Sequence, residues 1–181
     1  MSQQQIFEWI KQDALRMRAL HEAQKLGLED WCLAAGFVRN LVWDRLHQRP
    51  DNSPLNDIDV VYFNSQDLSP ETDRQYEKQL ETLAPDLPWS VKNQARMHLK
   101  YSREPYTSTC DAMSYWVEIE TAVGVRLNAD NQLELVAPLG IDSLFTFTIS
   151  ANPKHGIPEV LQQRARDKRW TERWPQLAIK L

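Results

Sequence analysis

Cysteine and glycine are both scarce in this sequence, which has two cysteines and five glycines among 181 residues. Cys32 and Cys110 stand far apart in the chain, and this spacing excludes both a zinc pair and a disulfide framework. The glycines form no phosphate-binding loop and no dinucleotide-binding motif, and no serine-hydrolase elbow occurs. These three kinds of enzyme are therefore excluded.

A long hydrophobic run and an excess of basic residues are also missing. No stretch approaches the ~20 apolar residues of a membrane span, and the beginning MSQQQIFEWI lacks the basic start of a signal peptide. We therefore expect a cytoplasmic protein with no membrane partner. The net charge is −4 and the isoelectric point is near 5.6. Without a general basic surface, nucleic acid is a poor candidate for the partner.

The composition is that of an ordinary globular domain, with 42% hydrophobic and 25% charged residues. We expect one domain over residues 1–181, with its core in residues 28–150. The charge is uneven, because from Lys154 onward seven basic residues stand against three acidic ones. The rest of the chain is correspondingly acidic.

Hydrophobic periodicity predicts alternating helices and strands in the first half of the chain and short strands after it. Helices are expected at residues 3–26, 37–47, 70–83 and 158–170, the last of them basic, with two short helices within 95–116. Strands are expected at residues 31–35, 58–63, 89–94, 123–127, 133–137 and 147–149. The order predicts an α+β (mixed α/β) domain with a small mixed sheet flanked by helices.

Two aspartates begin a strand that is otherwise apolar, IDVVYF. Side chains two apart on a strand point to the same face, so the carboxylates of Asp57 and Asp59 can converge. Two such carboxylates repel each other unless a cation lies between them, and oxygen ligands suit Mg²⁺ or Mn²⁺. The alternative is that Asp57 belongs to a turn and Asp59 pairs with a nearby arginine.

A glycine lies where the strand WCLAA meets the following helix. At such a turn, backbone N–H groups and the helix dipole can hold a phosphate. Arg39, one turn into the helix, would add a positive charge. The alternative is that Gly36 serves only a tight turn and that Arg39 pairs with an acidic residue.

The segments AAGFVRN and NDIDVVYF together resemble the polymerase-beta-type nucleotidyltransferase superfamily, and are similar to the GGxVRD and DID motifs of tRNA nucleotidyltransferases and poly(A) polymerases. VKNQARMHLKY, TAVGVRL and APLGIDSLF resemble a small bacterial family described only as nucleotidyltransferases. The resemblance implies a nucleoside triphosphate (NTP) donor and Mg²⁺ (or Mn²⁺) held by Asp57 and Asp59. It also implies that Gly36 and Arg39 lie at the phosphates.

The sequence departs from the superfamily pattern at three positions. Phe37 follows the glycine where a small residue is usual, and Asn40 stands where an aspartate often follows the arginine. The third carboxylate, which usually accepts the proton of the acceptor hydroxyl, is missing from the third strand, which offers Asn93. We expect Asn40 and Asn93 to contact the nucleotide. The remaining candidates for the third carboxylate are Glu118, Glu120 and Asp142.

The basic helix near the C-terminus offers further phosphate contacts, because Arg164 and Lys168 lie four residues apart on one face. The alternative is an ordinary solvated helix face. We expect a metal-dependent nucleotidyltransferase that moves a nucleoside monophosphate (NMP) from NTP to a hydroxyl of a small molecule or protein. A nucleotide-binding module without turnover, and an interaction protein without a nucleotide site, are the other hypotheses.

Overall fold

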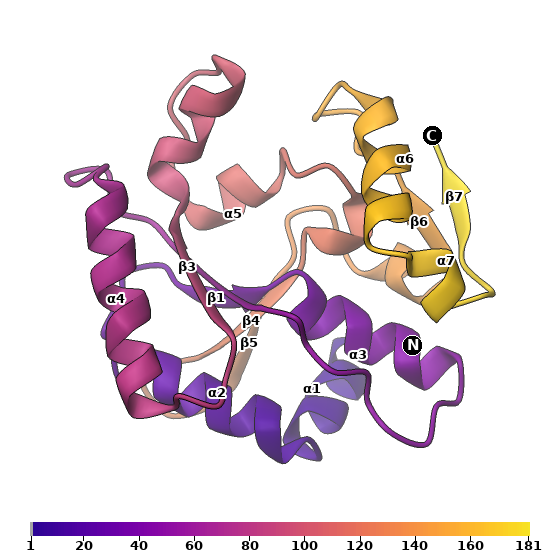
Figure 1. The fold of residues 1–181 in the computed structure, drawn as a ribbon, viewed down its shortest axis with the longest axis horizontal. Helices are drawn as coiled ribbons and strands as arrows, with labels where there is room; N and C mark the ends of the chain where they lie inside the picture. Colours follow the sequence, from indigo (N-terminus) through magenta and orange to yellow (C-terminus); the bar gives the residue numbers. More distant parts are fainter. Residues whose placement is uncertain (1) are drawn as a thin grey trace.

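The computed structural model describes residues 2–181 (Figure 1). Five strands form a mixed sheet in the order β3-β2-β1-β4-β5. Strands β2 and β3 are parallel, whereas the other neighbours in this sheet are antiparallel. This arrangement confirms the expected α+β class with a small mixed sheet flanked by helices. The strands are β1 (Cys32–Ala34), β2 (Ile58–Tyr62), β3 (Trp89–Asn93), β4 (Gly124–Leu127) and β5 (Leu133–Val136).

Most helices are short. The α-helices are α1 (Gln3–Lys11), α2 (Ala14–Gln24), α3 (Gly36–Leu46), α4 (Pro70–Leu83), α5 (Thr109–Met113), α6 (Pro158–Asp167) and α7 (Trp170–Arg173), and the 3-10 helices are η1 (Gln94–Tyr101), η2 (Ile119–Thr121) and η3 (Asp142–Phe145). Across residues 2–181, none of them combines the length and the apolar character that crossing a bilayer requires.

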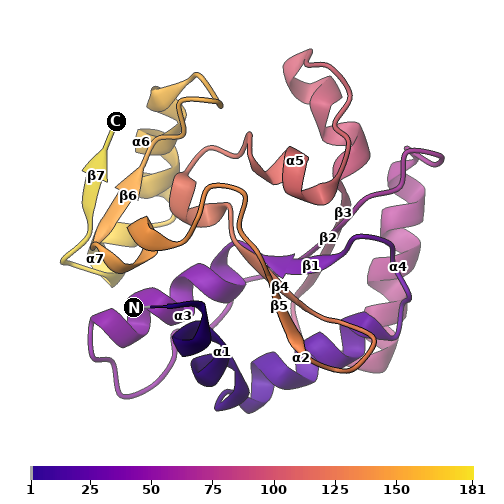
Figure 2. The same cartoon turned by 180° about the vertical axis from the view of Figure 1, so that it is seen from behind.

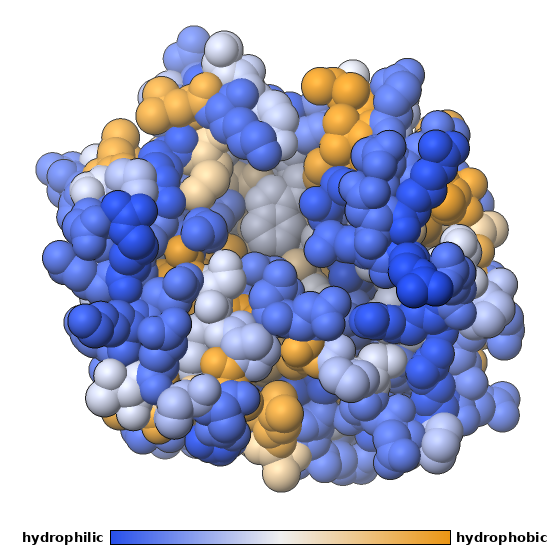
Figure 3. Space-filling view, in the orientation of Figure 1, coloured by the Kyte–Doolittle hydropathy of each residue, from blue (hydrophilic) through white to orange (hydrophobic). Residues whose placement is uncertain are grey.

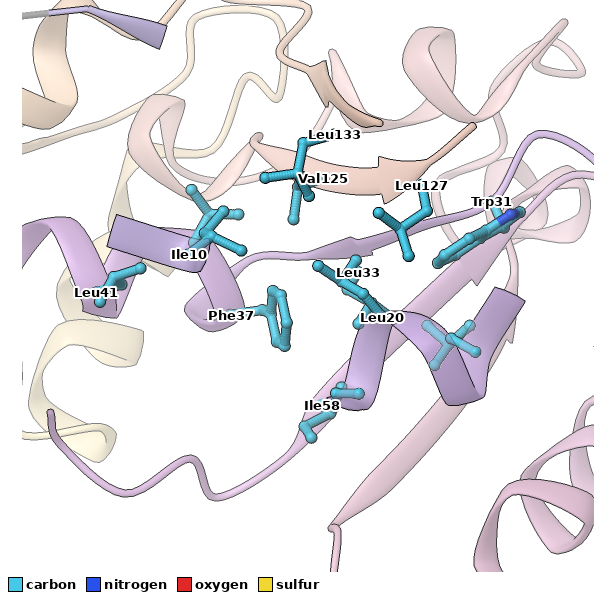
Figure 4. Packing of buried hydrophobic residues seen from close by; sticks show 14 of the residues in the cluster. Ile10, Leu20, Trp31, Leu33, Phe37, Leu41, Ile58, Val125, Leu127 and Leu133 are labelled. Carbon is cyan, nitrogen blue, oxygen red and sulfur yellow. The ribbon is translucent and has the colours of Figure 1, made fainter. Parts of the chain in front are cut away.

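The two faces of the sheet have different neighbours. Ile58, Val60 and Tyr62 of β2 point into the main hydrophobic core, which the helices α1 to α4 complete (Figure 4). Val61 points to the opposite face, where a smaller cluster joins the sheet to Met113 of α5. Because side chains alternate along a strand, Asp59 shares this second, less covered face with Val61.

A second core attaches the C-terminal part of the chain to α3. Strands β6 (Thr148–Ser150) and β7 (Ala178–Lys180) form a parallel pair, and α6 and α7 pack beside it (Figures 1 and 2). Trp43 of α3 lies edge-on to Trp170 and Trp174, with ring centroids 6.1 and 5.1 Å apart. The three tryptophans are buried, so this part of the chain holds a fixed position beside the sheet.

Several elements differ from the expectations, among them the short 3-10 helices η2 and η3, which were not expected. The helix expected at residues 3–26 is interrupted at Asp13, whose backbone is extended and whose side chain accepts a hydrogen bond from the Arg16 N–H and so caps α2. The helix expected at 158–170 ends at Asp167, because Arg169 takes the left-handed conformation, with φ of 52°. The sequence analysis did not predict β7, whose three side chains are exposed and therefore show no apolar alternation.

Candidate functional site

The two aspartates at the start of β2 line one cavity. Asp59 lies in the middle of the sheet, with Ala34 of β1 and Ser90 of β3 as its strand partners. Asp57 is exposed and Asp59 is partly buried. Burial, and then the negative charge of Asp57, raises the pKa of Asp59 to about 6. The structure therefore places a costly negative charge at this point.

The raised pKa of Asp59 predicts a pH-dependent stability. The folded state binds this proton more tightly than the unfolded chain, so its stabilisation is fully present below pH ~4 and is lost as the pH rises through about 6. We expect Asp59→Asn to raise the free energy of unfolding above pH 6 by on the order of 1–2 kcal/mol. Urea unfolding of both proteins at several pH values measures this gain, which should shrink toward pH 4. A gain independent of pH would contradict the prediction.

The turn between β1 and α3 has an unusual backbone. Ala35 has a φ of 56°, a conformation that favours glycine. Gly36, which begins α3, lies in tight surroundings: a Cβ atom there would lie 3.2 Å from Nδ2 of Asn40 and 3.4 Å from Nη2 of Arg39, so these side chains would have to shift slightly. The glycine therefore allows the Arg39 and Asn40 side chains to pack against the start of the helix.

Arg39 is a buried cation with neutral partners. Its Nη1 donates to Oγ1 of Thr121 at 2.6 Å, and its Nε and Nη2 both donate to Oδ1 of Asn40 at 3.2 and 3.0 Å. The guanidinium lies 5.1 Å from the ring of Trp43 and 4.7 Å from that of Trp170. Within residues 2–181 no carboxylate comes within ion-pair distance of it.

Burial lowers the pKa of Arg39 to about 10, so the side chain stays protonated at neutral pH. Its charge is not cancelled by a direct ion pair and faces the same cavity as the two aspartates. Asn40, which stands where the superfamily pattern often has an aspartate, is the acceptor that holds Arg39 and lines the same cavity. Thr121 and Trp170 were not predicted, because only the tertiary structure brings them to Arg39.

The C-terminal helix reaches the same cavity. Arg164 of α6 lines the cavity with Asp57 and Asp59, and so does Lys168, the first residue after α6. Arg164 donates from Nε to Oε1 of Glu118 at 2.5 Å, and Lys168 is exposed. Both positive charges oppose the rise in the pKa of Asp59.

Of the three candidates for a third carboxylate, only Glu118 lines a cavity with Asp59. Glu120 is buried elsewhere, where its Oε2 accepts from the N–H of Ser150. Asp142 is exposed at the start of η3 and lines neither cavity. The sequence could name these acids but could not place them.

Asn93 does not lie with the other candidate residues. It ends β3 and pairs with Tyr62, at the opposite end of β2 from Asp57. Its side chain is fully buried, accepts from the N–H groups of Asn64 and Ala95, and donates to the carbonyls of Asn64 and Asp67. Backbone groups occupy the polar atoms of Asn93, and it lines neither cavity, so the structure gives its expected nucleotide contact no support.

A larger cavity of about 460 Å³ adjoins the first. The two cavities share Ala35, Asp59, Thr121 and Arg164 in their walls. The larger one lies between the segment 92–117 and α6, and in the space-filling view a hollow opens between these parts, with mostly hydrophilic rims (Figure 3). Asp59 therefore lies at the junction of the two cavities.

Comparisons with known proteins agree on one family. A family model described as nucleotidyltransferase matches residues 21–179. A solved structure described as revealing a CCA-adding enzyme head domain is 36% identical, with a TM-score of 0.84, and the match covers 99% of this chain and 96% of that one. A search of curated proteins gave no match.

Two more distant structures share the fold. A CCA-adding enzyme solved with CTP has a TM-score of 0.58 and 14% identity, and the match covers 91% of this chain but 39% of that one. A tRNA-processing enzyme complex has a TM-score of 0.53 and 16% identity, with 90% and 42% of the two chains covered. The family model and the 36% identical structure each span most of this chain, and on that basis the protein belongs to the nucleotidyltransferase family.

Proposed function

We propose that the protein is a metal-dependent nucleotidyltransferase that moves NMP from NTP to an acceptor hydroxyl and releases pyrophosphate. One observation carries the proposal: the paired carboxylates of Asp57 and Asp59 share a cavity with Arg39, a buried cation that has only neutral hydrogen-bond partners. Carboxylates suit a divalent cation and the arginine suits a phosphate chain. A metal-bound triphosphate satisfies both.

The side chains present fit Mg²⁺ or Mn²⁺ bound together with the nucleotide. No group of three or more histidine, cysteine or acidic side chains that could hold a metal occurs in the described part of the chain. Mg²⁺ usually takes one or two carboxylates together with substrate phosphates and water, so Asp57 and Asp59 supply the expected protein share. When bound, the ion would neutralise charge on the reacting phosphate and on the leaving pyrophosphate.

The chain's own residues divide the remaining work. Arg39 and Lys168 hold the β and γ phosphates, and the walls of the cavity orient the chain of phosphates for displacement. Arg164 adds a third cation at the border of the two cavities. Glu118, which lines the larger cavity together with Asp59 and accepts hydrogen bonds from Arg164, is the candidate to accept the proton of the acceptor hydroxyl.

The test of this function is turnover with each of the four NTPs labelled at the α phosphate, with Mg²⁺ or Mn²⁺, and with purified candidate acceptors. Metal-dependent release of pyrophosphate together with a labelled acceptor supports the proposal. The second candidate function is a nucleotide-binding module without turnover, which is favoured by the absence, among residues 2–181, of three histidine, cysteine or acidic side chains grouped closely enough to hold a metal. Metal-dependent NTP binding with no pyrophosphate release would select it.

Arg164→Ala is expected to weaken the binding of Mg²⁺-NTP about tenfold, a loss of ~1.4 kcal/mol. NMP binding should change by less than twofold, because the proposed role of Arg164 is to add positive charge near the β and γ phosphates, which NMP lacks. Calorimetry with both nucleotides measures the difference. Arg166→Ala is the matched control, since Arg166 belongs to the same helix but is exposed and lines neither cavity. If Arg164→Ala and Lys168→Ala both leave NTP affinity within twofold, α6 takes no part in binding the donor.

The expectation that nucleic acid is a poor partner rests on the net charge of −4, which is a property of the whole chain. Similar structures are described as a CCA-adding enzyme and a tRNA-processing enzyme, so nucleic acid remains among the acceptors to be tested beside small molecules and proteins. The match covers 39% of the CCA-adding enzyme, so the acceptor of that whole enzyme is no more than a candidate for this chain.

A further inference from the structure

The larger cavity has an aromatic wall. Tyr101, Tyr106, Tyr115 and Trp116 line it, all from the segment that joins β3 to η2. Tyr106 lies 5.2 Å from Tyr115, with their ring planes inclined by 31°. Tyr101 is exposed, so the wall offers a ring at its open rim as well as rings inside. Aromatic rings can stack with any nucleobase, so this kind of contact does not depend on which base is bound.

The same wall carries positive charges that no acidic side chain cancels. Lys92 and Lys100 line the cavity and are exposed. The Arg103 guanidinium lies 4.7 Å from the ring of Tyr101 and 4.8 Å from that of Tyr115, and it donates to the carbonyl of His155 at 2.8 Å. In residues 2–181 none of these three cations has an ion-pair partner. They therefore favour an anionic ligand.

The chemistry of phosphoryl transfer indicates which ligand approaches from this side. In an in-line displacement, the attacking oxygen and the leaving oxygen lie on opposite sides of the phosphorus. The smaller cavity, with Arg39 and Lys168, is the place of the leaving pyrophosphate. The larger cavity begins at Asp59, where the two cavities meet, and so it lies on the side from which the acceptor must attack.

We propose that the larger cavity is the acceptor site and that it binds a nucleotide: a planar base stacked on the tyrosines and a phosphate held by Lys92, Lys100 and Arg103. The base–phosphate unit comes either from a free nucleotide or from the end of a nucleic acid strand. The volume of about 460 Å³ suits one such unit. The acceptor oxygen attacks the α phosphorus, the bond to pyrophosphate breaks, and the hydroxyl proton passes to Glu118. This inference rests on the proposed function.

The test is binding of two probes in the presence of a metal chelator, which suppresses donor binding. The probes are adenosine monophosphate and a short single-stranded oligonucleotide with a 5′ phosphate. We expect Lys100→Glu and Tyr101→Ala to weaken binding of the preferred probe at least fivefold. Lys78→Glu is the matched control, because Lys78 is exposed on α4 and lines neither cavity. It should change affinity by less than twofold.

The affinity for Mg²⁺-NTP, measured on the same variants, separates the two sites. It should stay within twofold in Lys100→Glu and Tyr101→Ala, and fall in Asp59→Asn. Preference for the oligonucleotide supports the end of a nucleic acid strand as acceptor, and preference for the monophosphate supports a free nucleotide. The proposal is overturned if neither probe binds, if the variants bind as the wild type does, or if they lose Mg²⁺-NTP instead. Failure of Asp59→Asn alone would count against the donor site and the proposed function.

Discussion

Asp59→Asn is expected to lower the rate of nucleotidyl transfer by about 10³-fold. The substitution keeps the shape of the side chain but removes the charge that is proposed to hold a divalent cation at the centre of the sheet. The affinity for Mg²⁺-NTP should fall at least tenfold, or ~1.4 kcal/mol, and chelation of the metal from the wild type should have the same effect. Turnover with labelled NTP and calorimetry measure the two changes.

This loss of activity is separable from a loss of folding. Asp59→Asn removes a partly buried charge whose pKa is raised to about 6, so the variant should unfold at a higher temperature than the wild type at pH 7. Asp51→Asn is the matched control, because Asp51 is exposed in the preceding loop and lines neither cavity. Its rate should equal that of the wild type. An Asp59→Asn variant with full activity would rule out the metal site.

Trp170→Ala is expected to cost ~3–5 kcal/mol of the free energy of unfolding. The side chain is 2% exposed in the second core, and it also covers one face of the Arg39 guanidinium at 4.7 Å. Without it, Arg39 gains water and freedom of movement, so the affinity for Mg²⁺-NTP should fall about tenfold. Urea unfolding and calorimetry below the unfolding transition measure the two effects.

A tryptophan outside the second core provides the comparison. Trp9 is half-buried against the main core and lies 6.3 Å from Phe145, and it contacts neither Arg39 nor the two cavities. Trp9→Ala should lower stability while leaving Mg²⁺-NTP affinity unchanged. If both variants bind the nucleotide as tightly as the wild type, the Trp170 ring has no part in positioning Arg39.

The strand that carries the aspartates could be predicted because its pattern is local. Ile58, Val60 and Tyr62 fill one face of β2, and the run is short, β-branched and aromatic, which is typical of a central strand. The role of Gly36 at the start of α3 could also be predicted, because the strand before it and the helix after it require a turn. These two local signals located Asp57, Asp59, Gly36 and Arg39 on neighbouring elements.

The surroundings of the site depend on residues that are distant in sequence. Glu118 and Arg164 are 46 residues apart, and Arg39 and Thr121 are 82 apart, so no window of the sequence shows either pair. Asn93 is the converse case: the sequence pattern assigns it to the site, but the structure places it away from both cavities. It stands where the family resemblance expects a carboxylate, yet its four hydrogen bonds go to the backbone of neighbouring loops. A polar residue at the end of a strand can serve the site or the loop, and sequence does not distinguish them.

The smaller cavity is completed late in synthesis, because Trp170 of α7 lies against Arg39 of α3 in its wall. The ribosome makes the five strands of the large sheet, which end at Val136, before it makes α6 and α7, and folding during synthesis proceeds from the N-terminal side. Contacts between distant residues also form late, because loop closure costs entropy. A nascent chain that has reached β5 holds both aspartates but lacks Arg164, Lys168 and Trp170, which complete the smaller cavity. If the proposed function holds, binding of the triphosphate should therefore appear only after the segment that carries α6 and α7 has docked.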